Sequence, residues 1–150
     1  MFMKKMCFLI MFCLLNTVSI SFAGDHKCGV CNMKIGEQSK HHVVLSDEAG
    51  SKAPLHVCSL SCVNKARKHD SGYSKSQVSD FNNPEKLLPG EDAFFLMKSE
   101  KIKQDLDDMA MPPFFGAFKT KAEADAAKKK YGDGVIVKGL GAALIEGGRK

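Results

Sequence analysis

Four of the six cysteines, in two close pairs that follow the first 23 residues, constrain this chain more than any other feature of its sequence. The first pair is Cys28 and Cys31, and the second is Cys58 and Cys62. Close thiol pairs of this kind are typical either of disulfides or of a metal site. We therefore expect the two segments that carry the pairs to meet in the folded chain.

The segment before the first pair has the features of an export signal. Lys4 and Lys5 stand near its start, and residues 6–15 are almost entirely apolar. Ser21-Phe22-Ala23 then places small residues two apart for cleavage. We expect residues 1–23 to be a signal peptide cleaved after Ala23, and the protein to be periplasmic. The apolar run is shorter than the about 20 residues of a membrane span, and a membrane anchor formed by an uncleaved signal is the alternative.

Composition and motifs exclude several classes of function. The net charge is +5, and the basic residues are scattered along the chain. A mild and scattered positive charge does not indicate nucleic acid binding. The sequence contains no Gly-x-Ser-x-Gly, no His-Glu-x-x-His and no phosphate-binding glycine loop. We therefore expect a binding protein and not an enzyme.

The region around the second cysteine pair predicts a hairpin followed by a helix. Residues 41–46 and 53–57 are rich in apolar and β-branched side chains and flank a turn, which indicates two paired strands. Ser59 is a suitable N-cap for a helix over residues 60–69. Because Cys58 and Cys62 are four residues apart at the start of this helix, we expect their sulfur atoms to face the same side.

The remaining segments complete an α+β pattern. Thr120 and Glu123 form a capping box that opens a helix ending near residue 131, with Ala122, Ala126 and Ala127 as its buried stripe. The other predicted elements are strands at 77–81, 93–98 and 135–138, a turn or loop at 100–108, an apolar loop at 109–118 and a flexible tail at 139–150. We expect residues 24–138 to form one metal-binding domain.

Sulfur ligands of two kinds favour a soft metal ion, above all Cu(I). Cys31 and Met33 place a thiolate and a thioether on one short loop, and both suit Cu(I). Met109 and Met111 lie in a proline-stiffened loop, and one of them is expected to close the site. Cys28 and Cys58 are second-rank ligands. The histidines are expected to be solvated or hydrogen-bonded rather than ligating.

Two other interpretations of the cysteines remain open. The four thiols, Cys62 included, fit a Zn(II) site of four thiolates with a structural or sensing role. Alternatively, two disulfides would staple a periplasmic binding protein, as is common in exported chains. The thioethers contribute to neither alternative.

The chain also resembles the NosL family, the exported copper chaperones for nitrous oxide reductase. The resemblance is carried by Cys28-Gly29-Val30-Cys31-Asn32-Met33, Val57-Cys58-Ser59, Val78-Ser79-Asp80-Phe81, Ala93-Phe94-Phe95-Leu96, residues 109–118, Lys121-Ala122-Glu123-Ala124 and Tyr131-Gly132-Asp133-Gly134. It implies a monomer of two small ββα-type halves packed as one compact domain. It also implies that Cu(I) is passed to the copper–sulfide centre of the reductase, with the help of a membrane transporter complex.

The resemblance assigns the copper ligands residue by residue. The copper-binding cysteine and methionine of the family correspond to Cys31 and Met33, and its later methionine corresponds to Met111 or Met109. Two departures stand out: the chain lacks a lipid-attachment cysteine, and Cys62 is extra. The segment from Cys58 to Cys62 resembles the metal-binding modules called TRASH. Another periplasmic copper enzyme as client, or a role in heavy-metal binding, is therefore the alternative.

Overall fold

A computed structural model of the chain describes residues 26–107 and 110–149. The predicted signal peptide and Met109 lie outside this range. Within it, no helix combines the length and the apolar character needed to cross a membrane.

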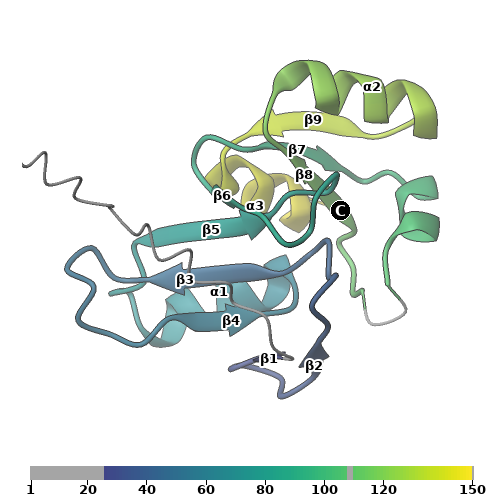
Figure 1. Cartoon of the computed structure of the whole chain (residues 1–150). Coiled ribbons are helices and arrows are strands. Elements are labelled where there is room, and N and C mark those ends of the chain that lie inside the picture. The colour runs from purple at the N-terminus through teal and green to yellow at the C-terminus, as the bar shows by residue number, and fades with distance from the viewer. Residues whose placement is uncertain (1–25, 108–109, 150) are drawn as a thin grey trace, which may run out of the picture.

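The N-terminal half is an antiparallel sheet with the strand order β4-β3-β5-β6 and one helix on its inner face (Figure 1). Its elements are β3 (Val43–Ser46), β4 (Leu55–Val57), α1 (Leu60–His69), β5 (Lys75–Ser79) and β6 (Leu87–Pro89). A small hairpin of β1 (His26–Lys27) and β2 (Lys34–Ile35) lies beside β4. The predicted hairpin and helix at the second cysteine pair are therefore confirmed, with shorter strands than expected.

The C-terminal half is a three-stranded antiparallel sheet with the order β8-β7-β9. Its elements are β7 (Phe94–Met97), the 3-10 helix η1 (Lys101–Asp105), β8 (Phe115–Phe118), α2 (Lys121–Tyr131), β9 (Val135–Lys138) and α3 (Leu140–Gly148). The apolar segment predicted over 93–98 is the central strand, and the strand predicted over 135–138 has the bounds expected for it.

The central strand β7 is buried on both faces, which explains its unbroken run of apolar residues. Phe95 and Met97 belong to the core that α1 and α3 share, whereas Leu96 belongs to a second core under α2. All three are fully buried. A strand covered on both sides has no polar face, so its sequence does not alternate.

Local hydrogen bonds fix the start and the end of α2 as the sequence predicted. The Thr120 side chain accepts a bond from the backbone N–H of Glu123, and the Glu123 carboxylate accepts one from the backbone N–H of Thr120. This is a complete capping box. Gly132 ends the helix in the left-handed conformation with φ 79°, which glycine adopts without steric cost.

Two predictions for the C-terminal half are wrong. The predicted flexible tail at 139–150 is instead the helix α3 over Leu140–Gly148, because Leu140 and Ala143 give it a fully buried face that packs in the main core. The predicted apolar loop at 109–118 ends in the strand β8, whose four residues are all buried. Apolar burial against β7 overrides the turn-forming and glycine-rich composition of both segments.

The stripe of alanines predicted for α2 is also wrong in its register. Ala127 is buried as expected, but Ala122 and Ala126 are exposed. The buried face is formed by Ala124, Ala127 and Tyr131. Tyr131 stacks edge-on against Phe81, and this bulky contact sets which side of the helix faces the sheet.

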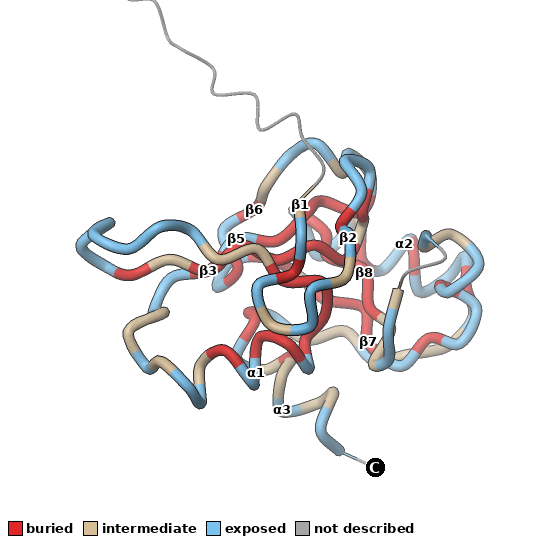
Figure 2. Tube along the Cα trace, turned by 90° about the horizontal axis from the view of Figure 1, so that it is seen from below, coloured by how far each residue is buried: buried red, intermediate tan, exposed pale blue. Residues whose placement is uncertain are grey.

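The α+β class and the packing of the halves as one compact domain are confirmed. A single core joins residues of both sheets, and Figure 2 shows buried residues continuing from β3 and β5 into β7 and β8. Helix α3 contributes to the junction because it packs against both α1 and β7. The C-terminal helix is therefore part of the frame that supports the N-terminal half.

Removal of the Leu140 side chain is expected to destabilise the whole protein. Leu140→Ala should lower the free energy of unfolding by about 2–5 kcal/mol, because it leaves a cavity in the shared core. The matched control is Ile145→Ala in the same helix, where the side chain is 63% exposed and the cost should stay within about 0.5 kcal/mol beyond helix propensity. Urea unfolding followed by circular dichroism measures both, and equal small effects would contradict a docked helix.

Candidate metal centre

The first cysteine pair lies in the tight loop between β1 and β2. The backbone N–H of Cys28 donates to the carbonyl of Met33 at 2.8 Å, and the N–H of Asn32 donates to the carbonyl of Cys28 at 2.8 Å. Asn32 adopts φ 63°, a left-handed conformation that asparagine tolerates better than most residues. These bonds hold the loop in a compact reversal that presents both thiols.

The second cysteine pair lies where β4 passes into α1. Ser59 caps the helix by accepting a hydrogen bond from the backbone N–H of Cys62 at 3.2 Å. This cap puts Cys58 just before the helix and Cys62 in its first turn, with their sulfur atoms 3.9 Å apart. The prediction that the two sulfur atoms face the same side is confirmed.

The two pairs meet and form a cluster of four thiols. The sulfur atoms of Cys28, Cys31, Cys58 and Cys62 all lie within 4.8 Å of one another, and all four residues are free cysteines. The shortest approach is 3.4 Å, between the sulfur atoms of Cys31 and Cys58. Tetrahedral coordination with a metal–sulfur distance of about 2.3 Å needs sulfur atoms about 3.8 Å apart. The cluster therefore fits a single metal ion.

Burial divides the four thiols into a covered back and an open front. Cys28, Cys58 and Cys62 are 1–4% exposed and belong to the main core. Cys31 is exposed at the surface of the loop. A partner can therefore reach the cluster through the Cys31 sulfur while the other three remain covered.

Local hydrogen bonds and burial give the thiols different pKa values. Burial opposes ionisation of Cys28, but hydrogen bonds from the backbone of Cys31, Val30 and Cys58 outweigh it and lower the pKa of Cys28 from 9.0 to about 7. Burial, together with the neighbouring thiols, raises the pKa of Cys58 and of Cys62. In the metal-free cluster Cys28 therefore ionises more readily than Cys58 and Cys62, and a metal ion that binds the latter two must displace their protons.

The structure brings together three of the predicted copper ligands, Cys31, Cys28 and Cys58. It adds Cys62, which the sequence analysis did not include among the copper ligands and considered for a zinc site, for a disulfide and for a TRASH-like segment. The signal for Cys62 was its spacing of four residues from Cys58, which set both sulfur atoms on the same side of one helical turn.

The predicted thioether ligands remain predictions. Met33 is half-buried at the end of the cysteine loop, Met111 is 40% exposed, and Met109 lies outside the described residues. The segment that precedes these two methionines approaches the N-terminal half, because Asp107 lies 3.6 Å from the Nε2 atom of buried His41. Burial lowers the pKa of His41, and the Asp107 carboxylate opposes that shift.

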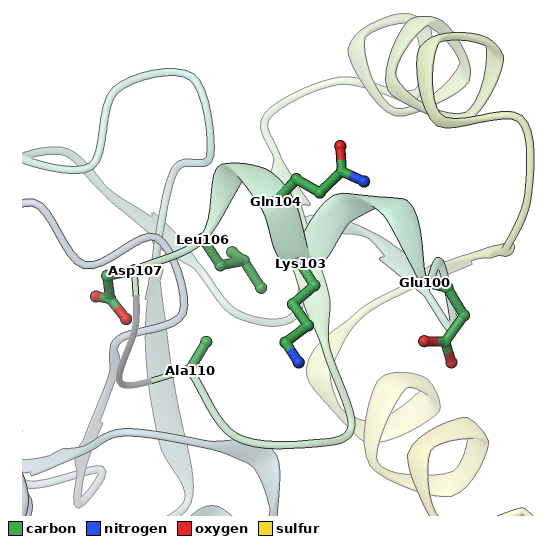
Figure 3. A pocket seen from close by; sticks show the side chains of 6 residues that line it. All are labelled: Glu100, Lys103, Gln104, Leu106, Asp107 and Ala110. Carbon is green, nitrogen blue, oxygen red and sulfur yellow. The ribbon is translucent and has the colours of Figure 1, made fainter.

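A hollow outside the thiol cluster lies on η1 and the residues beside it (Figure 3), with a volume of about 430 Å³. Its lining is Glu100, Lys103, Gln104, Leu106, Asp107 and Ala110. These side chains include both charges but no sulfur, so the hollow is not a second place for a soft metal.

No protein-family model matches the chain, and no curated protein matches it. Among solved structures, the chain is similar to the crystal structure of the copper chaperone NosL from Shewanella denitrificans. The two are 22% identical, the match covers 75% of this chain and 86% of that chain, and the TM-score is 0.56. The expected resemblance is therefore confirmed at the level of the fold.

The low pKa of Cys28 predicts a thiolate that forms near neutral pH. In the reduced, metal-free protein, thiolate absorbance in the ultraviolet should rise in a step centred near pH 7. Cys28→Ser should lose this step, since the backbone groups that stabilise the thiolate then face a hydroxyl group. Cys62→Ser is the matched control and should keep it, because the pKa of Cys62 is raised. A step that survives Cys28→Ser would assign the acidic thiol to another residue.

Proposed function

We propose that this chain is an exported metallochaperone that binds Cu(I) and transfers it to a copper enzyme. The observation that carries the proposal is the exposed Cys31 sulfur, 3.4 Å from the buried sulfur of Cys58. The similarity of the fold to that of a copper chaperone supports it.

The division of the cluster into a covered back and an open front suits transfer of an ion. Thiolates are soft ligands that favour Cu(I), and Cu(I) accepts few ligands at a time. An incoming thiolate or thioether can therefore take the place of the Cys31 sulfur without opening the core. The buried thiols would retain the ion until that exchange is complete.

We propose Cys31 and Cys58 as the nearest pair of ligands, with Cys28 beside them. Met33 follows Cys31 by two residues and supplies the predicted thioether from the same loop. Met111 or Met109 would close the site from the other half of the chain. The contact between Asp107 and His41 supports this closure, because it holds the preceding segment against the N-terminal half.

We further propose that the protein is periplasmic and that it delivers copper to a periplasmic copper enzyme. The predicted export signal at residues 1–23 supports the location, with an uncleaved anchor as the alternative. The client would be nitrous oxide reductase, at its copper–sulfide centre, or another periplasmic copper enzyme. A membrane transporter complex would assist the transfer.

A structural or sensing zinc module is the second candidate. It is favoured by the four sulfur atoms within 4.8 Å, of which three are buried, since closed four-thiolate sites are typical of structural zinc. The two candidates differ in the role of Cys31. A structural zinc ion needs all four sulfur atoms held, whereas a carrier needs one that can be replaced.

Loss of the Cys31 sulfur is expected to weaken Cu(I) binding. Cys31→Ser should lower the affinity at least about tenfold, or about 1.4 kcal/mol, because it removes the sulfur that partners Cys58. Competition with a coloured Cu(I) chelator under reducing conditions measures the change. Unchanged affinity would contradict the ligand assignment.

Two controls accompany this measurement. Ser61→Ala changes an exposed neighbour of Cys62 and should leave the affinity unchanged. Met33→Leu tests the thioether of the loop, and Met97→Leu is its matched control, since Met97 is a fully buried residue of the main core. The proposal expects weaker Cu(I) binding in Met33→Leu and unchanged binding in Met97→Leu.

Exposure of the reduced protein to equal amounts of Cu(I) and Zn(II) separates the two candidates. We expect native mass spectrometry to show one copper ion per chain, because soft thiolates prefer Cu(I) to Zn(II). Because Cys31→Ser should bind Cu(I) more weakly, added glutathione should remove the copper from this variant at a lower concentration than from the parent protein. Zinc retained against Cu(I) would favour the structural module.

A further inference from the structure

Three histidines from separate segments gather in one cluster outside the thiol site. They are His26 on β1, His42 just before β3 and His56 on β4. The ring centroids of His26 and His56 lie 3.8 Å apart, and that of His42 lies 5.0 Å from the ring of His56 and 5.7 Å from that of His26. We call this group the imidazole cluster.

The pleat of β3 and β4 accounts for the place of the imidazole cluster. Val43 and Val57 point into the main core toward α1, and they are paired across the two strands. His42 and His56 adjoin these residues, so they point to the opposite face of the sheet. The hairpin of β1 and β2 adds His26 on that face. The sheet thus separates the imidazole cluster from α1.

The hydrogen bonds of the imidazole cluster are incomplete. The Nε2 atom of His42 and the Nδ1 atom of His56 lie 2.8 Å apart, so the N–H of one ring donates a hydrogen bond to the nitrogen of the other. The Nε2 atom of His26 is buried and has no hydrogen-bond partner within the described part of the chain. A buried polar atom without a partner is costly, and it calls for an explanation such as an ion.

We propose that His26, His42 and His56 form a second metal site, which takes a divalent ion that prefers imidazole nitrogen, such as Zn(II) or Cu(II). Imidazole suits these ions, whereas the thiol cluster suits a softer one. Two nitrogen ligands of a tetrahedral Zn(II) lie about 3.3 Å apart. For an ion to replace the hydrogen bond, the His42 Nε2 and His56 Nδ1 atoms, now 2.8 Å apart, must separate to this distance. Both rings must also turn so that their lone pairs point at the ion instead of along the line between the two nitrogen atoms.

The third ligand would come from His26, whose unpartnered Nε2 atom lies in the same cluster. His26 is half-buried on the short strand β1, and its ring stacks on that of His56 with the centroids 3.8 Å apart. Its ring must therefore turn before the Nε2 atom can share an ion with the other two. Water would complete the coordination of the ion. The site thus uses one side chain from each of three segments.

The proposed site adjoins the thiol cluster along two chain segments. His26 precedes Cys28 by two residues, and His56 precedes Cys58 by two residues. A backbone hydrogen bond of 2.9 Å from Gly29 to the carbonyl of His56 joins these segments. An ion held by the histidines would therefore brace the cysteine loop against β4. The proposal does not depend on which metal the thiols bind.

Zinc binding to the reduced protein without the predicted signal peptide, residues 24–150, tests the proposal. One equivalent of Cu(I) is added first to occupy the thiols, and Zn(II) follows. We expect a further zinc ion per chain, whose X-ray absorption fine structure shows nitrogen or oxygen ligands at about 2.0–2.1 Å and no sulfur at about 2.3 Å. Zinc bound only through sulfur would overturn the proposal.

Single variants identify the ligands. His42→Gln and His56→Gln should each weaken the binding of this zinc ion at least tenfold while the far-ultraviolet circular dichroism is kept. His69→Gln, at the exposed end of α1, is the matched control and should not change it. The proposal is overturned if neither cluster variant weakens zinc binding, or if only His26→Gln does, since that result indicates a site at the chain end.

The comparison of variants remains informative if the proposed copper function is wrong. Without Cu(I) binding, the first zinc equivalent would fill the thiols in every variant. The imidazole site would then appear as the difference in bound zinc between the parent protein and His56→Gln. A failed copper function and a failed second site therefore give different results.

Discussion

The close contact between Gly29 and β4 is the constraint on which the metal centre depends. The backbone N–H of Gly29 donates a hydrogen bond to the carbonyl of His56 at 2.9 Å. A Cβ atom at this position would lie 2.2 Å from the Cδ1 atom of Leu55, so the end of that side chain would have to turn away. The lack of a Cβ atom at Gly29 lets the Leu55 side chain fill the space where the loop approaches the strand. Cys28 and Cys31 then reach the corner where Cys58 begins the turn into α1.

The core behind this contact gives the centre a rigid support. Cys28, Cys58 and Cys62 pack in the same core as Phe95 and Leu140, which come from the other half of the chain. Close-packed protein interiors are hardly compressible, so they transmit a displacement rather than absorb it. The three buried sulfur atoms are therefore held by the whole domain, whereas Cys31 is held by the loop alone. This difference in support parallels the difference in exposure.

Sequence reasoning located the elements that have local signals and missed those that do not. The caps at Ser59 and Thr120 gave the starts of α1 and α2, because capping depends on residues within one turn. Helix α3 has neither an acidic first turn nor a basic last turn, and no side chain caps it. Its helical state depends on burial of Leu140 against distant residues, which composition does not reveal. The strand β8 was missed for the same reason.

The site shows the same limit, because spacing reveals neighbours along the chain and only the fold reveals neighbours in space. Cys58 and Cys62 were predicted to face one side, and they do. Each histidine, taken alone in the sequence, is an ordinary polar residue. The pairing of Val44 with His56 sets the register that places His42 beside His56. A one-residue slip would turn His56 into the core. The register that buries the valines therefore also assembles the imidazole cluster.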